Sequence, residues 1–543
     1  MRHEVYAREL GQHTANGEKR LSDALDHRNV YLVATVQGQV AGFVSLTPPG
    51  ERYSIDKYTA RGNLPFAVDD WLYEIRLLTV ARQYRGREVA TLLMYAAFRW
   101  VESHGGRRVV AIGRREVTEM YLRCGLEPLG VTVRCGAVTY DLLAATTAAL
   151  RQRINTLGGV VDRLESGTDW QLSFPFRKPA CCFHGGAFFE AVGPRLDSLE
   201  RSRSIINADV LDAWFPPAPT VLQSLQDFLP WLLRTSPPTA CEGLIQAIAD
   251  ARRVKAENIL PGAGSSDLIF RAFRTWLSPR SHALILDPTY GEYPHVLENV
   301  IGCTTDRLLL SAARNFVVDL DQLRAAMADN YDLIVIVNPN SPTGRHIARK
   351  ELEQLLRQAP PTTRIWVDET YTDYVGAEGS LESFAAKSEN VIVSKSMSKV
   401  YALSGARVAY LCAGAHQLEE LRAYTPPWVV SLPAQLAAIR ALAEGRYYRE
   451  RYAETRRLRE ALTIELLNLG LDCVPGVANF VLGELPVDGP SAGEVVKRCR
   501  EQGLFIRDAS TMGSRLGNHR LRIAVKDAET NARMLQILRN VLA

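Results

Sequence analysis

The sequence predicts an α/β protein with a smaller N-terminal α/β domain and a larger second domain, whose mainly parallel sheet lies between helices and is followed by a small C-terminal α/β subdomain. Three observations support this class. The chain has 543 residues, more than one ordinary domain holds. From about residue 204, apolar runs alternate with helical patterns, as expected for parallel strands joined by helices. Before that point, a strand, a glycine turn and an amphipathic helix follow one another within residues 72–104.

Charge and apolar content argue against nucleic-acid and membrane partners. The 64 basic and 60 acidic residues give a formal net charge of +4, which implies no strong attraction to either. The N-terminus, MRHEVYAREL, lacks the apolar core of a signal peptide. No uncharged apolar run approaches the roughly 20 residues needed to cross a bilayer. We therefore expect a cytoplasmic protein.

Cysteine usage favours a reducing compartment over a disulfide framework, because the nine cysteines are scattered over a long chain. The dense group Cys181, Cys182 and His184 has no partner CxxC or paired histidine to complete a metal site. We expect no metal.

The N-terminal part begins with a predicted hairpin over residues 30–46 and a strand over residues 72–80. An amphipathic helix follows, in which these apolar residues recur at helical spacing: Val89, Leu92, Leu93, Ala96, Ala97 and Trp100. Backbone N–H groups at the start of such a helix can hold a pyrophosphate.

Residues 1–142 resemble the GNAT acyltransferase family. Four residues fit the acyl-CoA loop of that family: Arg85, Gly86, Val89 and Ala90. Glu88 stands where the family has a glycine, and its carboxylate would repel the ligand unless it points away. Tyr121 stands where the family has its frequent general acid. The resemblance implies acetyl-CoA as a possible second ligand, with a structural or regulatory domain as the favoured alternative.

Residues 143–203 are expected to form a packed connector rather than a flexible linker, because they combine a helical stretch with an aromatic-rich stretch. We expect this connector to pack on the domain that follows.

The most informative stretch of the second domain is VIVSKSMSKVYALSGARVAYL, residues 391–411. Lys399 follows an apolar strand, where a partly desolvated amine can form a Schiff base with an aldehyde cofactor. Ser396, Ser398 and Arg407 can hold a phosphate by hydrogen bonds and charge. Pyridoxal 5'-phosphate (PLP) is the cofactor that needs both. Lys395 is not the expected Schiff-base lysine, because its spacing to Arg407 does not fit.

Two further segments fit this cofactor. A glycine-rich turn before a helix carries Gly264, Ser265 and Ser266, whose N–H groups and hydroxyls can bind a phosphate. Asp368 ends a buried strand, where its carboxylate can keep the pyridine nitrogen protonated. Tyr371, three residues on, can hydrogen-bond the phenolic oxygen.

Together these residues resemble the class I and II aminotransferases of the fold-type I PLP enzymes, over most of residues 204–543. The closest branch holds the histidinol-phosphate aminotransferases and threonine-phosphate decarboxylases. The resemblance implies a PLP-binding large domain over 204–440, a small domain over 441–543 and a homodimer. It places Tyr290 on the pyridine ring and Arg522 at the substrate α-carboxylate.

The resemblance also points to Asn479 and Trp428 on the substrate side. Ser341 stands where the family has the asparagine that bonds the phenolic oxygen, so Ser341 itself, Asn338 or Asn340 would take that role. Residues 235–239 lack the tyrosine that reaches the neighbouring subunit's phosphate in this branch.

The predicted function is a PLP-dependent transferase acting on a small-molecule amino acid or amino-acid conjugate by aminotransferase chemistry. Lys399, Asp368 and Tyr290 are its expected catalytic residues. Two alternatives stay open: a PLP-dependent lyase, decarboxylase or γ-elimination or replacement enzyme of specialised metabolism, and a bifunctional acyl-CoA N-acyltransferase and PLP enzyme. The substrate itself cannot be identified from the sequence.

Overall fold

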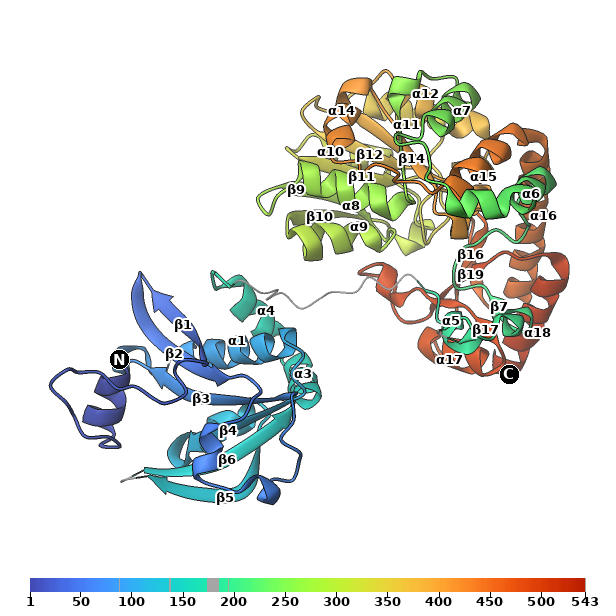
Figure 1. The fold of residues 1–543 in the computed structure, drawn as a ribbon. Helices are drawn as coiled ribbons and strands as arrows, with labels where there is room; N and C mark the ends of the chain where they lie inside the picture. Colours follow the sequence, from blue (N-terminus) through green and yellow to red (C-terminus); the bar gives the residue numbers. More distant parts are fainter. Residues whose placement is uncertain (87, 136–137, 173–184, 194, 543) are drawn as a thin grey trace. The chain divides into compact units, whose positions relative to one another are not determined.

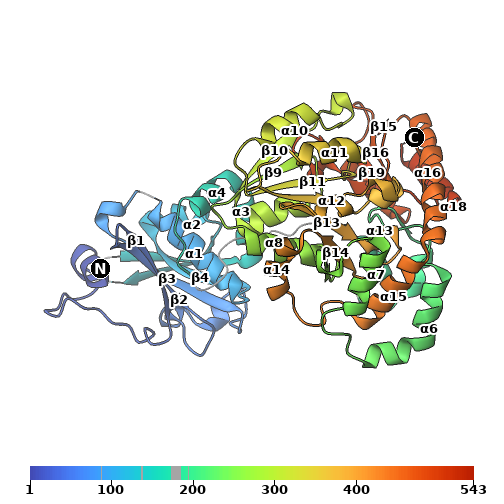
Figure 2. The ribbon, with the colours of Figure 1, turned by 90° about the horizontal axis from the view of Figure 1, so that it is seen from above.

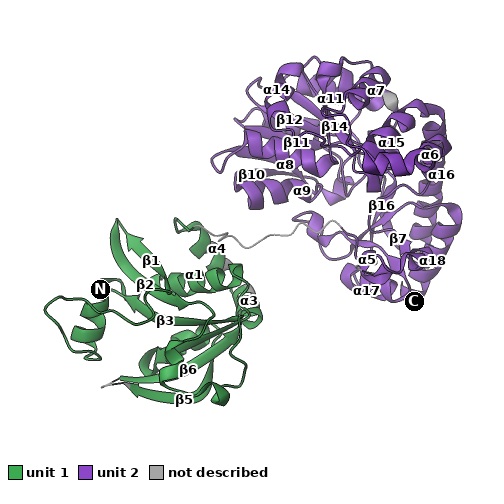
Figure 3. Cartoon of the chain, viewed as in Figure 1, with its two compact units in different colours: residues 1–179 green, residues 180–543 purple. Residues whose placement is uncertain are grey.

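The computed structural model describes residues 1–86, 88–135, 138–172, 185–193 and 195–542. The chain divides into two compact units, residues 1–179 and residues 180–543 (Figure 3). Each unit has its own hydrophobic core. In the described part of the chain, no helix has the length and apolar character to cross a membrane.

Unit 1 is built on a six-stranded sheet in the order β1-β2-β3-β4-β6-β5 (Figure 1). Its strands are β1 (Val30–Val36), β2 (Gln39–Thr47), β3 (Leu72–Val80), β4 (Arg108–Arg114), β5 (Glu127–Cys135) and β6 (Val138–Thr146). Its α-helices are α1 (Val89–Ser103), α2 (Thr118–Arg123), α3 (Thr147–Asn155) and α4 (Gly158–Ser166). The predicted hairpin is thus β1 and β2, and the predicted strand over residues 72–80 is β3.

Strands β3 and β4 are parallel and part towards their carboxyl ends. Their paired register runs only from Leu72 with Arg108 to Ile75 with Ala111, although both strands continue. Leu77 has a φ of 54°, where the register between β2 and β3 also shifts. Such a bulge bends a strand and changes the direction of its side chains. The separation leaves room for a cavity between the two strand ends.

Residues 147–172, in the first part of the expected connector, belong to unit 1 and pack against its other elements. Helix α3 contacts α1 and β6, and the ring of Trp170 lies 6.3 Å from the ring of Tyr95 in α1. Tyr95 also donates a hydrogen bond to Glu165. This first part of the connector therefore lies with unit 1 and not on the following domain, because Trp170 and α3 cover apolar residues of α1. The described residues of the connector from Gly185 on belong to unit 2.

The boundaries predicted at 203 and 440 stay predictions, whereas the one at 142 falls inside β6. Cys181, Cys182 and His184 lie outside the described residues. Within those residues, no group of three His, Cys, Asp or Glu side chains is placed to hold a metal ion.

Unit 2 has a seven-stranded sheet in the order β10-β9-β11-β12-β13-β14-β8. Its strands are β8 (Ile259–Gly262), β9 (His282–Asp287), β10 (Thr304–Leu309), β11 (Leu333–Val337), β12 (Arg364–Asp368), β13 (Val391–Ser396) and β14 (Ala409–Cys412). The strands β10, β9, β11, β12 and β13 are parallel to one another, and β14 is antiparallel to both of its neighbours. The sheet is therefore mainly parallel, as predicted.

Helices cover both faces of this sheet. The helices in its part of the unit are α6 (Pro219–Arg234), α7 (Glu242–Arg252), α8 (Ser265–Trp276), α9 (Glu292–Pro294), α10 (Leu320–Met327), α11 (Arg349–Leu356), α12 (Glu382–Ala385), α13 (Met397–Val400), α14 (Ala415–Ala423) and α15 (Leu432–Ala443). Helices α8 and α14 share a core with Leu333, Val335 and Val337 of β11. Helices α7, α10 and α11 share the other core with Ile334 and Ile336. Figure 2 shows α10 and α11 on one side of the strands and α8 and α14 on the other. Residues of β11 contribute alternately to the two cores, because successive side chains of a strand point to opposite sides of the sheet.

The C-terminal part of unit 2 holds a smaller four-stranded sheet in the order β15-β16-β19-β18. Its elements are β15 (Asp472–Val474), β16 (Phe480–Glu484), β17 (Leu504–Phe505), β18 (Arg507–Asp508), β19 (Arg520–Ala524), α16 (Gly445–Asn468), α17 (Ala492–Glu501) and α18 (Ala528–Leu542). The earlier elements α5 (Phe188–Val192) and β7 (Ile206–Asn207) lie beside it in Figure 1, where β7 pairs with β17. The segment after β7 therefore leads from the small sheet to the large one.

Candidate active site

Four of the predicted site residues lie at one edge of the large sheet. Tyr290 follows β9, Ser341 follows β11, Asp368 ends β12 and Lys399 follows β13. These four strands are parallel, so their carboxyl ends meet at the same edge. The order of the strands thus brings together residues that are more than 100 positions apart.

Lys399 forms an ion pair that the sequence did not reveal. Its Nζ lies 2.9 Å from Oδ1 of Asp212, in the segment that leads from β7 to α6. Burial lowers the pKa of Lys399, and the charge of Asp212 acts against this shift. Lys526 lies in the same electrostatic environment, where burial and the charge of Lys399 lower its pKa to about 8 although Asp212 opposes the shift.

Lys395, whose spacing did not fit the cofactor lysine, pairs with two other carboxylates. Its Nζ donates a 2.6 Å hydrogen bond to Asp373 and lies 3.6 Å from Glu369. All three side chains are buried. A lysine paired with two buried carboxylates keeps its proton, and these contacts raise its pKa.

The start of α8 and the Arg407 side chain approach each other closely. A Cβ atom at Gly264 would lie 2.4 Å from Nη2 of Arg407, so only glycine leaves this space. Arg407 also donates a 3.3 Å hydrogen bond to the Ser398 hydroxyl. The hydroxyl of buried Ser396 accepts a hydrogen bond from the backbone of Ser398. A helix start, a guanidinium and two hydroxyls form a suitable cradle for a phosphate.

Ser265 and Ser266 are the first residues of α8, so their N–H groups have no partner within the helix. The Ser266 hydroxyl donates a 3.0 Å hydrogen bond to Glu292, and the Tyr290 hydroxyl donates to the same oxygen at 2.7 Å. Burial and Glu292 raise the pKa of Tyr290. Glu292 therefore fixes the ring of Tyr290 beside the start of α8.

Three hydrogen bonds hold the carboxylate of Asp368. Tyr293 donates to Oδ2 at 2.7 Å, while the backbone and hydroxyl of Thr370 donate to Oδ1 at 2.9 and 2.6 Å. Each carboxylate oxygen has two lone-pair sites, so Asp368 retains capacity for a further donor. Trp366 in turn donates to the Tyr293 hydroxyl at 2.9 Å.

Arg522 enters the site from β19. It donates to the Ser341 hydroxyl at 3.2 Å and to the backbone oxygen of Asp209 at 3.1 Å. Burial lowers the pKa of this guanidinium, and the nearby hydroxyl of Tyr371 acts in the opposite direction. Within the described part of the chain, Nε of Arg522 has no hydrogen-bond partner.

The asparagines beside Ser341 use their amide donors within the loop. Asn338 donates to the backbone oxygen of Ile347 at 3.0 Å. Asn340 donates to Pro288 at 2.9 Å and to the Thr343 hydroxyl at 3.2 Å. Ser341, whose oxygen accepts from Arg522, keeps its own proton for another acceptor. Of these three residues, Ser341 is thus the one whose side-chain donor is not used in the described hydrogen bonds.

Asn479 and Trp428 differ in their relation to the site. Asn479 is buried and donates a 3.0 Å hydrogen bond to the backbone oxygen of Leu211, next to Asp212. Trp428 is 54% exposed, and its backbone N–H bonds to Thr239. Among the described residues, no hydrogen bond joins its side chain to the other predicted residues.

Sequence reasoning missed three residues of this edge: Asp212, Tyr293 and Lys526. Asp212 lies almost 190 positions before its partner, and no pattern links them. Tyr293 follows Tyr290 by three residues in YGEYP, and this close spacing was a usable signal for a second tyrosine in the same turn.

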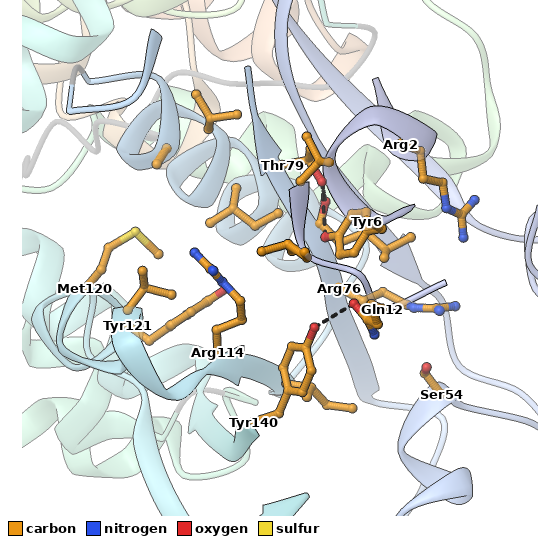
Figure 4. Close-up of a pocket in the computed structure, with 18 of the residues that line it drawn as sticks. Arg2, Tyr6, Gln12, Ser54, Arg76, Thr79, Arg114, Met120, Tyr121 and Tyr140 are labelled. Carbon is orange, nitrogen blue, oxygen red and sulfur yellow. Dashed lines mark hydrogen bonds between the residues drawn. The ribbon is translucent and has the colours of Figure 1, made fainter. Parts of the chain in front are cut away.

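Unit 1 contains a cavity of about 390 Å³ between the parted ends of β3 and β4 (Figure 4). Arg85, Gly86 and Ala90 of the predicted acyl-CoA loop line it, and so does buried Tyr121. Val89 is part of the neighbouring core. Glu88 is absent from the lining and lies 3.3 Å from Arg163 of α4. Its carboxylate therefore points away, which removes the expected conflict with an anionic ligand.

Family comparisons match both units. Residues 226–539 match the family Aminotransferase class I and II, and residues 3–126 match the Acetyltransferase (GNAT) family. Similar proteins include the histidinol-phosphate aminotransferase of Moorella thermoacetica, 30% identical over 60% of this chain and 83% of that protein. Another is histidinol-phosphate aminotransferase 1 of Thiobacillus denitrificans, 29% identical over 65% of this chain and 90% of that protein.

Solved structures share the fold of unit 2. The histidinol-phosphate aminotransferase of Sinorhizobium meliloti in complex with pyridoxal-5'-phosphate has a TM-score of 0.59 at 22% identity, over 67% of this chain and 99% of that one. The L-threonine-O-3-phosphate decarboxylase of Porphyromonas gingivalis has a TM-score of 0.55 at 22% identity, over 62% of this chain and 99% of that one. Both resemblances inferred from the sequence, and the order of the two domains, are confirmed.

Proposed function

Because the chain belongs to the class I and II aminotransferase family and is thus a PLP-dependent transferase, we propose that Lys399 is its cofactor-binding lysine and that its substrate is a small amine bearing an anionic group. The observation that carries this proposal is the segment Asp209–Asp212. Its backbone oxygens accept from Arg522 and Asn479, and its Asp212 pairs with Lys399. One short segment thus connects the reactive amine with the buried guanidinium.

The residues of the sheet edge fit PLP. Gly264, Ser265, Ser266, Ser396, Ser398 and Arg407 would hold its phosphate. Tyr290 would cover its ring, Asp368 would pair with its pyridine nitrogen, and Tyr371 and Ser341 would bond its phenolic oxygen. The fit rests on the close approach of Arg407 to Gly264, which brings a guanidinium to the helix start that would bind the phosphate. When bound, PLP supplies an aldehyde that reacts with amines and a ring that withdraws electrons from the substrate.

Lys399 would move protons at its Nζ during the reaction. Burial favours its neutral form, which can accept a proton from a substrate carbon, and Asp212 favours the charged form that returns it. Because burial and Asp212 act on the pKa of Lys399 in opposite directions, the amine can take both roles. Asp212 would also orient the amine through their 2.9 Å contact.

Arg522 would hold the anionic group of the substrate. A guanidinium can bind a carboxylate or a phosphate by two parallel hydrogen bonds. Its burial strengthens that pairing, and Ser341 and Asp209 fix its direction. Amino acids share an amine and an anionic group with histidinol phosphate, the compound in the names of the relatives. Asn479 and Trp428 would complete the substrate side.

The test is a screen of such amines with the PLP-loaded protein. We expect the PLP absorbance to change to that of pyridoxamine phosphate, with release of the corresponding carbonyl compound, since amino transfer leaves the nitrogen on the cofactor. Release of carbon dioxide without pyridoxamine phosphate would instead identify a decarboxylase.

We also infer a homodimer in the cytoplasm. Helix α6 exposes a set of large apolar side chains: Leu222, Phe228, Leu229, Trp231 and Leu233. Exposed apolar groups of this size favour association, and a second copy is the expected partner in this family. Sedimentation should show a dimer whose Trp231→Glu variant is monomeric, whereas a monomeric native chain would exclude this arrangement.

A further inference from the structure

Helix α13, which carries Lys399, is too short to satisfy its own carbonyl groups. It spans only Met397–Val400, and the last carbonyls of any helix lack partners within that helix. Backbone N–H groups of the following turn reach the carbonyls of Met397 and Ser398, each at 3.2 Å. The next three carbonyls, those of residues 399–401, depend on donors from other elements.

Three tyrosine hydroxyls supply these donors. Tyr374, in the turn after β12, donates to the carbonyl of Lys399 at 2.9 Å. Tyr452 of α16 donates to the carbonyl of the next residue at 2.9 Å, and Tyr448 of the same helix donates to that of Tyr401 at 3.4 Å. The rings of Tyr374 and Tyr452 lie 5.2 Å apart, edge to face. The backbone of the reactive lysine is therefore held by side chains from two other elements.

Helix α16, which leads to the small sheet (Figure 1), also contacts the segment of Asp212. Trp214, two residues after Asp212, donates from its ring nitrogen to the Thr455 hydroxyl at 2.8 Å. The Tyr448 hydroxyl accepts at 3.1 Å from the backbone N–H that precedes α6. Tyr448, Tyr452 and Thr455 follow one another at intervals of four and three residues, so they share one face of α16. This face therefore contacts the segments of both partners of the ion pair.

A buried network of charges holds the residues on either side of α13. Before the helix, Nζ of Lys395 donates to Asp373 at 2.6 Å. After it, Arg252 donates to the Tyr401 hydroxyl at 3.0 Å and lies 3.5 Å from the same Asp373 carboxylate. One carboxylate thus connects both flanks of the lysine, which restricts its backbone further.

The geometry of the ion pair depends on this restriction. A lysine amine lies at the end of a flexible four-carbon stem, so it reaches many positions when its backbone is free. Fixing the backbone of both partners reduces the entropy that their 2.9 Å contact costs. Burial raises the pKa of the Tyr374 and Tyr452 hydroxyls, so both stay neutral and act through hydrogen bonds and not through charge.

We propose that Tyr374 and Tyr452 are positioning residues, which hold the backbone of Lys399 so that its amine keeps its contact with Asp212. Neither hydroxyl acts on the amine directly, since both bind backbone carbonyls. The importance of this role for catalysis rests on the proposed function, in which Lys399 is the cofactor lysine. The effect on the amine itself does not.

Competitive acetylation of the full-length apoenzyme, followed by peptide mass spectrometry, measures the reactivity of the Lys399 amine against pH. The double variant Tyr374→Phe with Tyr452→Phe keeps both rings and removes only the two hydroxyls. We expect the Lys399 profile to move to lower pH by about 0.5 unit, half of the smallest effect of a neighbouring charge, because a looser pair weakens the influence of Asp212. The single variant Tyr452→Phe should give a smaller shift in the same direction, which tests the role even if the double variant misfolds.

A double-mutant cycle with Asp212→Asn separates positioning from a general loss of structure. In the Asp212→Asn background, the tyrosine changes should give no further shift, because the contact that they support is absent. Other charges that act with Lys399 come from Arg407, Arg522 and Lys526, and all of the variants retain them.

Tyr331→Phe serves as the control, because it removes a buried hydroxyl that donates to Asp306 at 2.9 Å, ahead of β11. Its Lys399 profile should equal that of the native chain. The proposal is overturned if the tyrosine variants keep the native profile, or if their shift is undiminished in Asp212→Asn. A shift that vanishes in Asp212→Asn supports it even if the PLP label is found on another lysine, a result that would overturn only the proposed function.

Discussion

Nζ of Lys399 lies 2.9 Å from Oδ1 of Asp212, a carboxylate that reaches the sheet edge from the segment between β7 and α6. This ion pair sets the protonation of the amine that we assign to the cofactor. Burial lowers the pKa of Lys399, and Asp212 counteracts this effect. The balance between the two is open to direct test.

Asp212→Asn should shift the pH dependence of PLP capture by the apoenzyme to lower pH. Loss of the negative charge lowers the pKa of Lys399 further, so the neutral amine that attacks the aldehyde becomes abundant at lower pH. We expect the rising limb of the rate profile to move by about one pH unit, the low end of the effect of a neighbouring charge.

Asp227→Asn is the matched control for this change. Asp227 lies exposed on α6, where its carboxylate accepts a hydrogen bond from Gln223. The variant removes the same charge from a residue that does not pair with Lys399, so the pH profile of PLP capture should stay unchanged. An unchanged profile in Asp212→Asn, or a shift to higher pH, would exclude the assigned role of Asp212.

Gly264→Ala should weaken PLP binding at least about tenfold, since a methyl group would displace the Arg407 guanidinium that completes the phosphate cradle. Gly264 has a φ of 91° and a ψ of 166°, a conformation that is essentially restricted to glycine. We therefore also expect the free energy of unfolding to fall by about 1–3 kcal/mol. Equilibrium titration of apoenzyme with PLP and denaturant unfolding measure the two effects.

Gly405→Ala provides the comparison, because it lies two residues before Arg407 with open space around its Cβ position. It should bind PLP like the native chain. Equal affinities for the two variants would show that the start of α8 does not hold the phosphate.

Arg522→Gln should reduce kcat/KM for an amine with an anionic group by about tenfold to a hundredfold. The estimate corresponds to about 1.5–3 kcal/mol for a hydrogen bond to a charged group. For a matched amine without the anion, the loss should be much smaller. PLP binding should persist, since Arg522 is assigned to the substrate.

Arg515→Gln removes an exposed arginine of the same domain and should leave these constants unchanged. If Arg522→Gln affected charged and neutral amines equally, the guanidinium would have a structural role and not a part in recognition.

Local sequence patterns were sufficient to predict the strand ends that carry the expected site residues. Lys399 and Asp368 each close an apolar run, and parallel strands place their ends at one edge. The patterns also separated Lys399 from Lys395, whose buried carboxylate partners explain its presence in the strand. The order of the strands therefore determines most of the candidate site.

Contacts between distant segments could not be predicted in the same way. Asp212 and Lys399 are 187 residues apart, and a single carboxylate in an irregular segment carries no periodic signal. The packing of Trp170 on Tyr95 likewise depends on tertiary contacts, so the placement of the first part of the connector with unit 1 could not be predicted. The direction of Glu88 became clear only from its partner Arg163 in α4.

The cofactor lysine is identified most directly by reducing the PLP-loaded protein with borohydride and locating the attached pyridoxyl phosphate by peptide mass spectrometry. We expect a label on Lys399 and none in Lys399→Ala, whereas Lys395→Ala should keep the label. A label on Lys395 or Lys526, or a Lys399→Ala protein that is still labelled, would contradict the assignment of the cofactor lysine.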